Sequence, residues 1–165
     1  MENGTTRRRP NKTAARRTPK ERPQSGERGF WRVSTMPKGN IDRAVAAGLW
    51  GTSKGIGMKN VRPGDRIVFY VSGWSRDAGY WGVAKVTSAP FVSHTEVWYD
   101  DIYPVRIKIV AERPLVSRPV TSAALKTRLG GRRLTFLRQA GVIALTAAEY
   151  DAIAGLLASP ARKNP

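Results

Sequence analysis

One short run, residues 67–71, constrains the fold more than any other part of the chain. It reads Ile-Val-Phe-Tyr-Val, so apolar side chains would occupy both faces of a strand. A strand of this kind is covered on both faces and lies inside a sheet, not at its edge. The preceding residues 62–66, Arg-Pro-Gly-Asp-Arg, have the composition of a tight turn. We therefore predict a central strand that begins directly after that turn.

Shorter patterns predict the rest of the N-terminal part. We expect a first strand at residues 30–34, then a helix at 41–47 that Asn40 caps and Gly48 terminates. A glycine-rich loop should follow from Trp50 to Val61. Further strands are expected at 80–86, after a hairpin connection at 73–79, and at 103–110, where Arg106 and Lys108 would share an exposed face.

The C-terminal third changes to helical patterns. A short helix is expected at 121–129, and the ambiguous run 132–139 favours helix over strand. A strand at 141–145 leads into a helix at 145–157, for which Thr146 and Glu149 form a capping box. These elements predict an α+β fold: a strongly bent mixed sheet, or partial barrel, of five or six strands with about three small helices.

Charge and length suggest one basic domain. The 165 residues carry a net charge of +17, which favours a phosphate-rich partner. Residues 1–28 contain nine basic and three acidic residues and no large apolar residue after the initiator Met, so we expect a disordered basic tail. That tail would serve as a non-specific grip on phosphates or as a solubilising leader. The folded domain is assigned to 29–160, and 161–165 is a C-terminal tail.

Composition also argues against several classes of site. The chain has no cysteine and one histidine, so neither a metal site nor another cofactor is expected. No apolar run is long enough to span a membrane, and no apolar core follows the basic N-terminus as in a signal peptide. Cytoplasmic localisation is the expectation. His94 and the pair of consecutive residues Asp100 and Asp101 form no recognisable catalytic set, so we do not expect an enzyme.

Two tryptophans carry the functional signal. Trp50 and Trp98 each lie in or beside a Gly-rich or polar segment, where exposed indole area is costly unless it stacks on something. In a basic protein the flat, uncharged stacking partner is a nucleobase. Two indoles facing each other could hold one base, and a methyl group on that base would add apolar contact. Such a slot requires the base to leave its stack.

Motifs in this order resemble those of a known family. They are the run F-W-R-V-S-T-M-P-K-G-N-I-D-R-A-V-A-A-G-L-W-G-T-S, then V-R-P-G-D-R-I-V-F-Y, Y-W-G-V-A-K-V, V-W-Y-D-D and G-V-I-A-L-T-A-A-E-Y-D-A-I. Over about residues 29–158 the chain resembles the EVE domains of the PUA-like superfamily, which are related to YTH domains. The resemblance implies a PUA-like fold and a reader of a modified base.

The same resemblance implies roles for individual residues. Trp50 and Trp98 would form an aromatic cage, Asn40 would hydrogen-bond a ring edge, and Thr35 would lie beside the pocket. Ser34 stands where YTH domains commonly have a Lys, and no third cage wall is identified. EVE domains are associated with modified DNA, including 5-methylcytosine, often in bacterial restriction systems, whereas YTH domains read N6-methyladenine in RNA. DNA is favoured here, together with a restriction-type nuclease or ATPase partner.

Basic residues around this pocket are candidates for phosphate contacts. They are Lys38, Arg43, Lys54, Lys59, Arg76, Arg132 and Arg133. The expected protein is a monomer. Two other functions stay open: a general RNA or tRNA-binding module without preference for a modification, and an enzyme acting on a nucleotide or nucleic acid through His94 or Asp100.

Overall fold

The computed structural model describes residues 27–130 and 141–159. Its elements in chain order are β1 (Phe30–Thr35), α1 (Gly39–Ala47), β2 (Leu49–Thr52), the 3₁₀ turn η1 (Met58–Asn60), β3 (Arg66–Val71), β4 (Gly79–Val86), β5 (Phe91–Val92), β6 (Val105–Ala111), α2 (Ser122–Arg128), β7 (Val142–Leu145) and α3 (Ala147–Ala158). The predictions made for most of 1–28, for 132–139 and for 161–165 lie outside the described residues.

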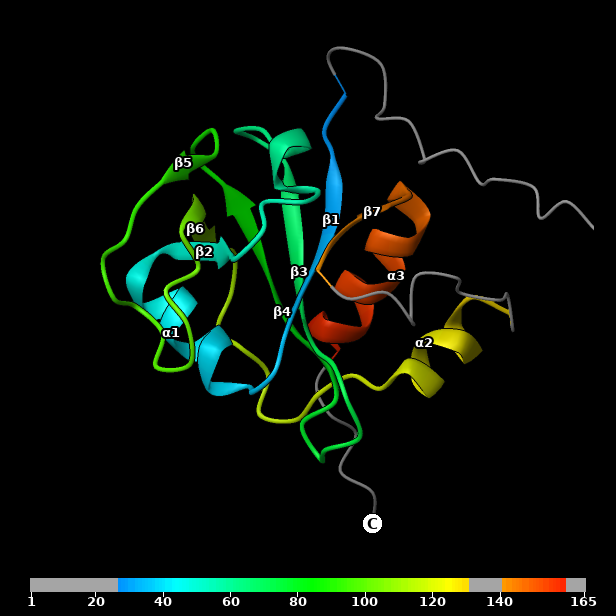
Figure 1. Cartoon of the computed structure of the whole chain (residues 1–165). Coiled ribbons are helices and arrows are strands. Elements are labelled where there is room, and N and C mark those ends of the chain that lie inside the picture. The colour runs from blue at the N-terminus through cyan, green and yellow to red at the C-terminus, as the bar shows by residue number, and fades with distance from the viewer. Residues whose placement is uncertain (1–26, 131–140, 160–165) are drawn as a thin grey trace, which may run out of the picture.

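The strands form one curled mixed sheet, a half-barrel, in the order β2-β6-β4-β3-β1-β7 (Figure 1). β1 and β3 are parallel, the other neighbours are antiparallel, and the two-residue β5 pairs with β6 outside this order. β3 lies between β1 and β4, so the prediction of a central strand is confirmed. The predicted α+β class with a bent mixed sheet and three α-helices is confirmed within the described residues.

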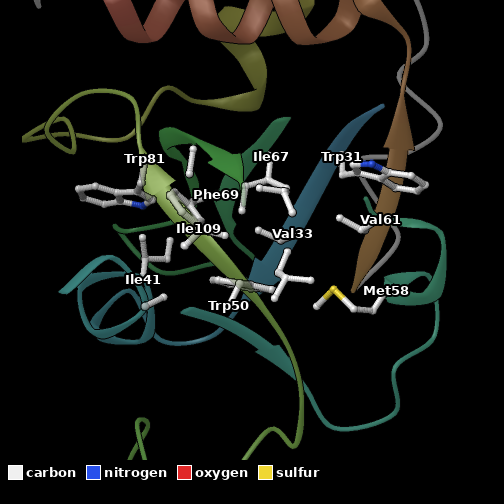
Figure 2. Close-up of a cluster of buried hydrophobic side chains, with 14 of the residues drawn as sticks. Trp31, Val33, Ile41, Trp50, Met58, Val61, Ile67, Phe69, Trp81 and Ile109 are labelled. Carbon is white, nitrogen blue, oxygen red and sulfur yellow. The ribbon is translucent and has the colours of Figure 1, made fainter. Parts of the chain in front are cut away.

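Alternation along β3 divides the apolar residues between two cores. Ile67, Phe69 and Val71 belong to one cluster of buried side chains, which includes Trp50 (Figure 2). Val68 and Tyr70 belong to a second cluster on the opposite face of the sheet, where α3 packs against β1, β3 and β4 and α2 packs against α3 (Figure 1). The two-sided apolar pattern therefore has a direct structural cause.

The start of α3 and the end of α1 agree with the predictions, and the start of α1 does not. Thr146 and Glu149 form the predicted capping box of α3, and Gly48 ends α1 with a φ of 64°. The prediction that Asn40 caps α1 is wrong, because the helix begins at Gly39 and Asn40 is buried in its first turn. The predicted loop from Trp50 to Val61 is wrong in part, because Trp50 is in β2 and the loop contains η1.

A buried carboxylate joins the start of β1 to the turn before β3. Asp65 is 2% exposed and accepts hydrogen bonds from the backbone N–H of Gly29 (2.8 Å), the indole N–H of Trp31 (2.8 Å) and the backbone N–H of Arg62 (2.9 Å). The Pro-Gly-Asp turn thus does more than reverse the chain. Its aspartate aligns the two parallel strands at one end of the sheet.

Within 27–130 and 141–159, no helix is both long and apolar enough to cross a bilayer.

Candidate functional site

A pocket of about 270 Å³ opens where β1 ends and α1 begins, beside β2 and the segment between β5 and β6. Its lining consists of Ser34, Thr35, Met36, Asn40, Trp50, Gly51, Ser72, Trp98 and Tyr103. All five residues predicted from the sequence to form a base pocket are in this lining. The fold therefore brings together segments that lie more than 60 residues apart in the chain.

Trp50 is a wall of the pocket and also part of the core. It is 3% exposed, and its ring packs against Phe69 with the centroids 5.6 Å apart and the planes tilted by 40° (Figure 2). The expectation of a loop tryptophan is wrong for this residue, because β2 pairs with β6 and directs the indole inward. Its buried indole N–H has no hydrogen-bond partner among the described residues.

Trp98 enters from the irregular segment between β5 and β6. It is 5% exposed, and its indole N–H donates to the backbone carbonyl of Asn40 at 3.0 Å. Tyr103 meets this ring edge-on, with the centroids 5.3 Å apart and the planes at 89°. The orientation of Trp98 is thus determined by α1 on one side and by its own segment on the other.

Asn40 is the polar centre of the site. Its amide nitrogen donates to the hydroxyl of Thr35 (3.0 Å) and to the carboxylate of Asp100 (2.9 Å), and the hydroxyl of Tyr103 donates to the same carboxylate (2.7 Å). Burial would raise the pKa of Asp100, but the hydrogen bonds from Asn40 and Tyr103 outweigh it and hold that pKa below its usual value. The ionised carboxylate only accepts hydrogen bonds, so it determines which end of the Asn40 amide faces it.

Ser34 lies differently from its neighbour Thr35. Its hydroxyl accepts from the backbone N–H of Gly141 (2.7 Å) and donates to the Gly141 carbonyl (3.2 Å), which ties β1 to the start of β7. Adjacent residues of a strand point to opposite faces, so Thr35 and Ser34 cannot both direct their side chains into the pocket. Ser34 therefore lines the pocket, but its hydroxyl forms its hydrogen bonds with the backbone of Gly141.

Tyr103 was not found from the sequence, and neither were Met36, Gly51 or Ser72. Tyr103 has a φ of 48°, in the left-handed region that a bulky residue occupies at a cost of about 1–2 kcal/mol. Burial, together with the hydrogen bond to Asp100, raises the pKa of its hydroxyl to about 12, so this group stays protonated at neutral pH. The sequence signal for Tyr103 is an aromatic ring five residues after Trp98, but the alternating pattern at 103–110 predicts a strand there.

A buried arginine supports the segment that carries Trp98. Arg106 was expected on an exposed face but is fully buried, and its guanidinium donates to the carbonyls of Tyr103, Thr95 and Ile102 and to the hydroxyl of Ser93. It also lies over the ring of Trp98, 5.4 Å from the centroid. The expectation fails because the segment 93–103 covers one end of β6, while Lys108 on the same strand face stays exposed.

Gly51 permits the close approach of the pocket walls. A Cβ at this position would lie 2.8 Å from the Cβ of Tyr103 and 2.9 Å from the ring of Trp98. We expect Gly51→Ala to cost about 1–3 kcal/mol of stability through overpacking and to displace these rings. Chemical denaturation and near-UV circular dichroism measure the two effects. Gly39→Ala is the matched control, because a Cβ at Gly39 meets nothing within 4 Å; equal behaviour of the two variants would contradict the prediction.

The predicted phosphate contacts are not equally available. Lys54, Lys59 and Arg76 are exposed. Lys38 pairs with Asp42 at 2.6 Å, and Arg43 stacks on the exposed ring of Tyr99 at 3.2 Å from its centroid. Arg132 and Arg133 lie outside the described residues.

The candidate acid–base groups show no catalytic arrangement. His94 is exposed and is not part of the pocket lining, and the Asp100 carboxylate already accepts from Asn40 and Tyr103. In the part of the chain that the structure describes, no group of three or more His, Cys, Asp or Glu residues could hold a metal ion.

Comparisons with known proteins agree with this architecture. A UPF0310 protein of Pyrococcus abyssi is 30% identical over 90 residues, which are 49% of this chain and 58% of that protein. The structure of human THYN1 in complex with 5-methylcytosine-containing DNA has a TM-score of 0.58 at 15% identity, covering 80% of this chain and 99% of that one.

The YTH domain of Zygosaccharomyces rouxii MRB1 in complex with N6-methyladenosine RNA also has a TM-score of 0.58, at 17% identity, covering 89% of this chain and 95% of that one. These two likenesses establish the PUA-like fold. The EVE domain family matches residues 29–156, which is most of the chain. The chain belongs to the EVE domain family.

Proposed function

We propose that this protein is a non-catalytic reader of modified nucleobases in nucleic acid, with DNA favoured over RNA. One observation carries the proposal: Trp50 and Trp98, from distant segments, line a single pocket together with Asn40 and Thr35. The basic charge of the chain adds the attraction to phosphate that such a reader requires. The DNA and RNA complexes of THYN1 and of the MRB1 YTH domain support the proposal by likeness of fold.

Pocket size favours a single base. The volume of about 270 Å³ lies at or below the lower end of the range for small-molecule pockets, so one heterocycle fits better than a whole nucleotide. Aromatic walls stabilise such a guest by about 1–3 kcal/mol per stacked ring. A methyl group on the base adds apolar area to the same contact, at about 0.8 kcal/mol for a fully buried group.

Polar groups of the pocket suggest which edge of the base is read. The Asn40 amide nitrogen donates to Thr35 and Asp100, so its carbonyl oxygen is the atom that can accept from a base. The Thr35 hydroxyl oxygen accepts from Asn40, which leaves the hydroxyl hydrogen to donate. One acceptor next to one donor complements an amino group beside a ring nitrogen. Cytosine and adenine both present this edge, and both keep it when 5-methylcytosine or N6-methyladenine forms.

The experiment compares matched oligonucleotides. We expect wild type to bind DNA carrying 5-methylcytosine or N6-methyladenine more tightly than the plain sequence, as measured by fluorescence anisotropy at fixed salt. Trp98→Ala should weaken binding of the modified DNA by about 5- to 150-fold, the equivalent of one stacking contact. Val110→Ala, which shortens an exposed side chain on β6, is the control and should bind as wild type.

Two outcomes would decide against a reader. Equal affinity for modified and plain DNA and RNA, with steep salt dependence, would indicate a general nucleic-acid binder. Turnover of an oligonucleotide that His94→Ala abolishes would indicate an enzyme. If modified DNA is bound selectively, co-purification with a nuclease or ATPase would test the proposed restriction partner.

A further inference from the structure

A loop that carries an exposed tryptophan lies beside the mouth of the pocket. Trp74 is fully exposed in the connection between β3 and β4, which projects from the lower end of the molecule in the view of Figure 1. Met36, a pocket-lining residue, is 62% exposed. A Cβ on Gly73 would lie 3.1 Å from the Met36 sulfur, so the loop touches the pocket lining immediately before Trp74.

The reach of the chain places Trp74 near the ligand. Ser72 lines the pocket and donates to the carbonyl of Thr35 through its backbone N–H (3.0 Å). Two residues of extended chain span at most about 7 Å, so the Cα of Trp74 lies within that distance of Ser72. A base in the pocket has left its stack, but the flanking nucleotide stays joined to it through one unit of the backbone. A nucleotide adjacent to a base in the pocket is therefore within reach of the Trp74 ring.

The loop is held in shape, although its tryptophan contacts solvent. The indole N–H of Trp81 donates to the Asp77 carbonyl at 2.8 Å, and the N–H of Ala78 donates to the Ser75 carbonyl at 3.1 Å. An exposed indole on an ordered loop needs little ordering when a partner binds, so it binds with a small entropic cost. Arg76 is exposed in the same loop and supplies a charge for a phosphate next to the stacked base.

We infer that Trp74 stacks on the nucleobase that flanks the one in the pocket. When a base leaves its stack, the face of its neighbour becomes exposed. Trp74 covers that face, and this contact tightens binding to a strand without depending on the modification. The inference rests on the proposed reader function, because the pocket must first hold a base.

The test separates the pocket from the loop by ligand length. A nucleoside, 5-methyl-2′-deoxycytidine or N6-methyladenosine, fills the pocket and offers no flanking base. An oligonucleotide with the same modified base, single-stranded or duplex, offers both. We expect Trp74→Ala to bind the nucleoside as wild type does and to bind both oligonucleotides about 5- to 150-fold more weakly. Trp74→Phe, which keeps a flat ring, should recover most of the loss, and Ile56→Ala on another exposed loop should have no effect.

The other possible outcomes each decide for or against the stacking role of Trp74. Wild-type affinity of Trp74→Ala for both oligonucleotides, with selectivity for the modification retained, would overturn the inference and leave the reader function standing. If wild type does not distinguish modified from plain DNA, but still binds the nucleoside, and Trp74→Ala weakens binding of both DNAs, the preference for a modification fails and the stacking role beside a base in the pocket stands. Absence of nucleic-acid binding would overturn both. Loss of a dimer in Trp74→Ala, with unchanged affinity for the oligonucleotides, would instead assign this surface to self-association.

Discussion

Arg106→Met is expected to lower the free energy of unfolding by about 3–5 kcal/mol. Its guanidinium is fully buried and donates to three backbone carbonyls and one hydroxyl of the segment 93–103. Methionine fills much of the same volume but donates nothing. Because a hydrogen bond from a charged group is worth about 1.5–3 kcal/mol, the loss of several such donors exceeds the loss of one average hydrogen bond.

The same change should weaken base binding. Trp98 belongs to the segment that Arg106 holds, and the guanidinium also lies over the indole ring. We expect the affinity of folded Arg106→Met for modified DNA to fall toward that of Trp98→Ala. Urea denaturation and anisotropy titration measure the two quantities. Lys108→Met, an exposed position two residues along the same strand, is the control; an unfolding free energy within about 0.5 kcal/mol of wild type for Arg106→Met would contradict the prediction.

Asp65→Ala is expected to cost about 2–4 kcal/mol of stability without changing the pocket. Three N–H donors, from Gly29, Trp31 and Arg62, converge on this carboxylate and would be left unpartnered at the start of β1 and β3. The pocket lies at the other end of β1, so binding at a temperature where the variant is folded should match that of wild type.

A substitution of nearly the same shape tests the cause. Asp65→Asn presents one amide nitrogen to donors that need an acceptor, so it should recover only part of the loss. Asp151→Ala removes an exposed carboxylate from α3 and controls for the change in net charge. If Asp65→Asn were as stable as wild type, the three hydrogen bonds would not account for the role of this residue. Asp65→Ala should lower the free energy of unfolding without weakening base binding, whereas Arg106→Met should lower both.

Local patterns predicted most of the elements because their causes are local. The turn predicted at 62–66 leads into β3, which begins at Arg66, the capping box begins α3, and Gly48 ends α1 as predicted. Each depends on residues a few positions apart, whose spacing can be read directly. The capping role of Asn40 failed for the opposite reason. Its side chain donates to Asp100, 60 residues away, and the helix begins one residue earlier, at Gly39.

In the candidate site too, some features could be predicted from the sequence and others depend on tertiary contacts. Pocket positions Trp50, Trp98, Asn40, Thr35 and Ser34 came from the residues and from the family resemblance, and the structure places all five in one lining. Alternation alone placed Arg106 on an exposed face, because a strand pattern does not show which loop will cover it. Tyr103 and Gly51 join the site only through contacts between β2 and the segment before β6.

Residue types and spacing alone determined a basic domain with a central two-sided strand, capped helices and two unusual tryptophans. Those properties arise from hydrophobic period, turn chemistry and charge, which act over a few residues or over the whole composition. Only the folded chain decided that the two indoles line one pocket, that Arg106 holds the segment of Trp98, and that Asp65 joins two strands. These features require residues distant in sequence to be packed at hydrogen-bonding or van der Waals distance, and only the curvature and order of the sheet determine those distances.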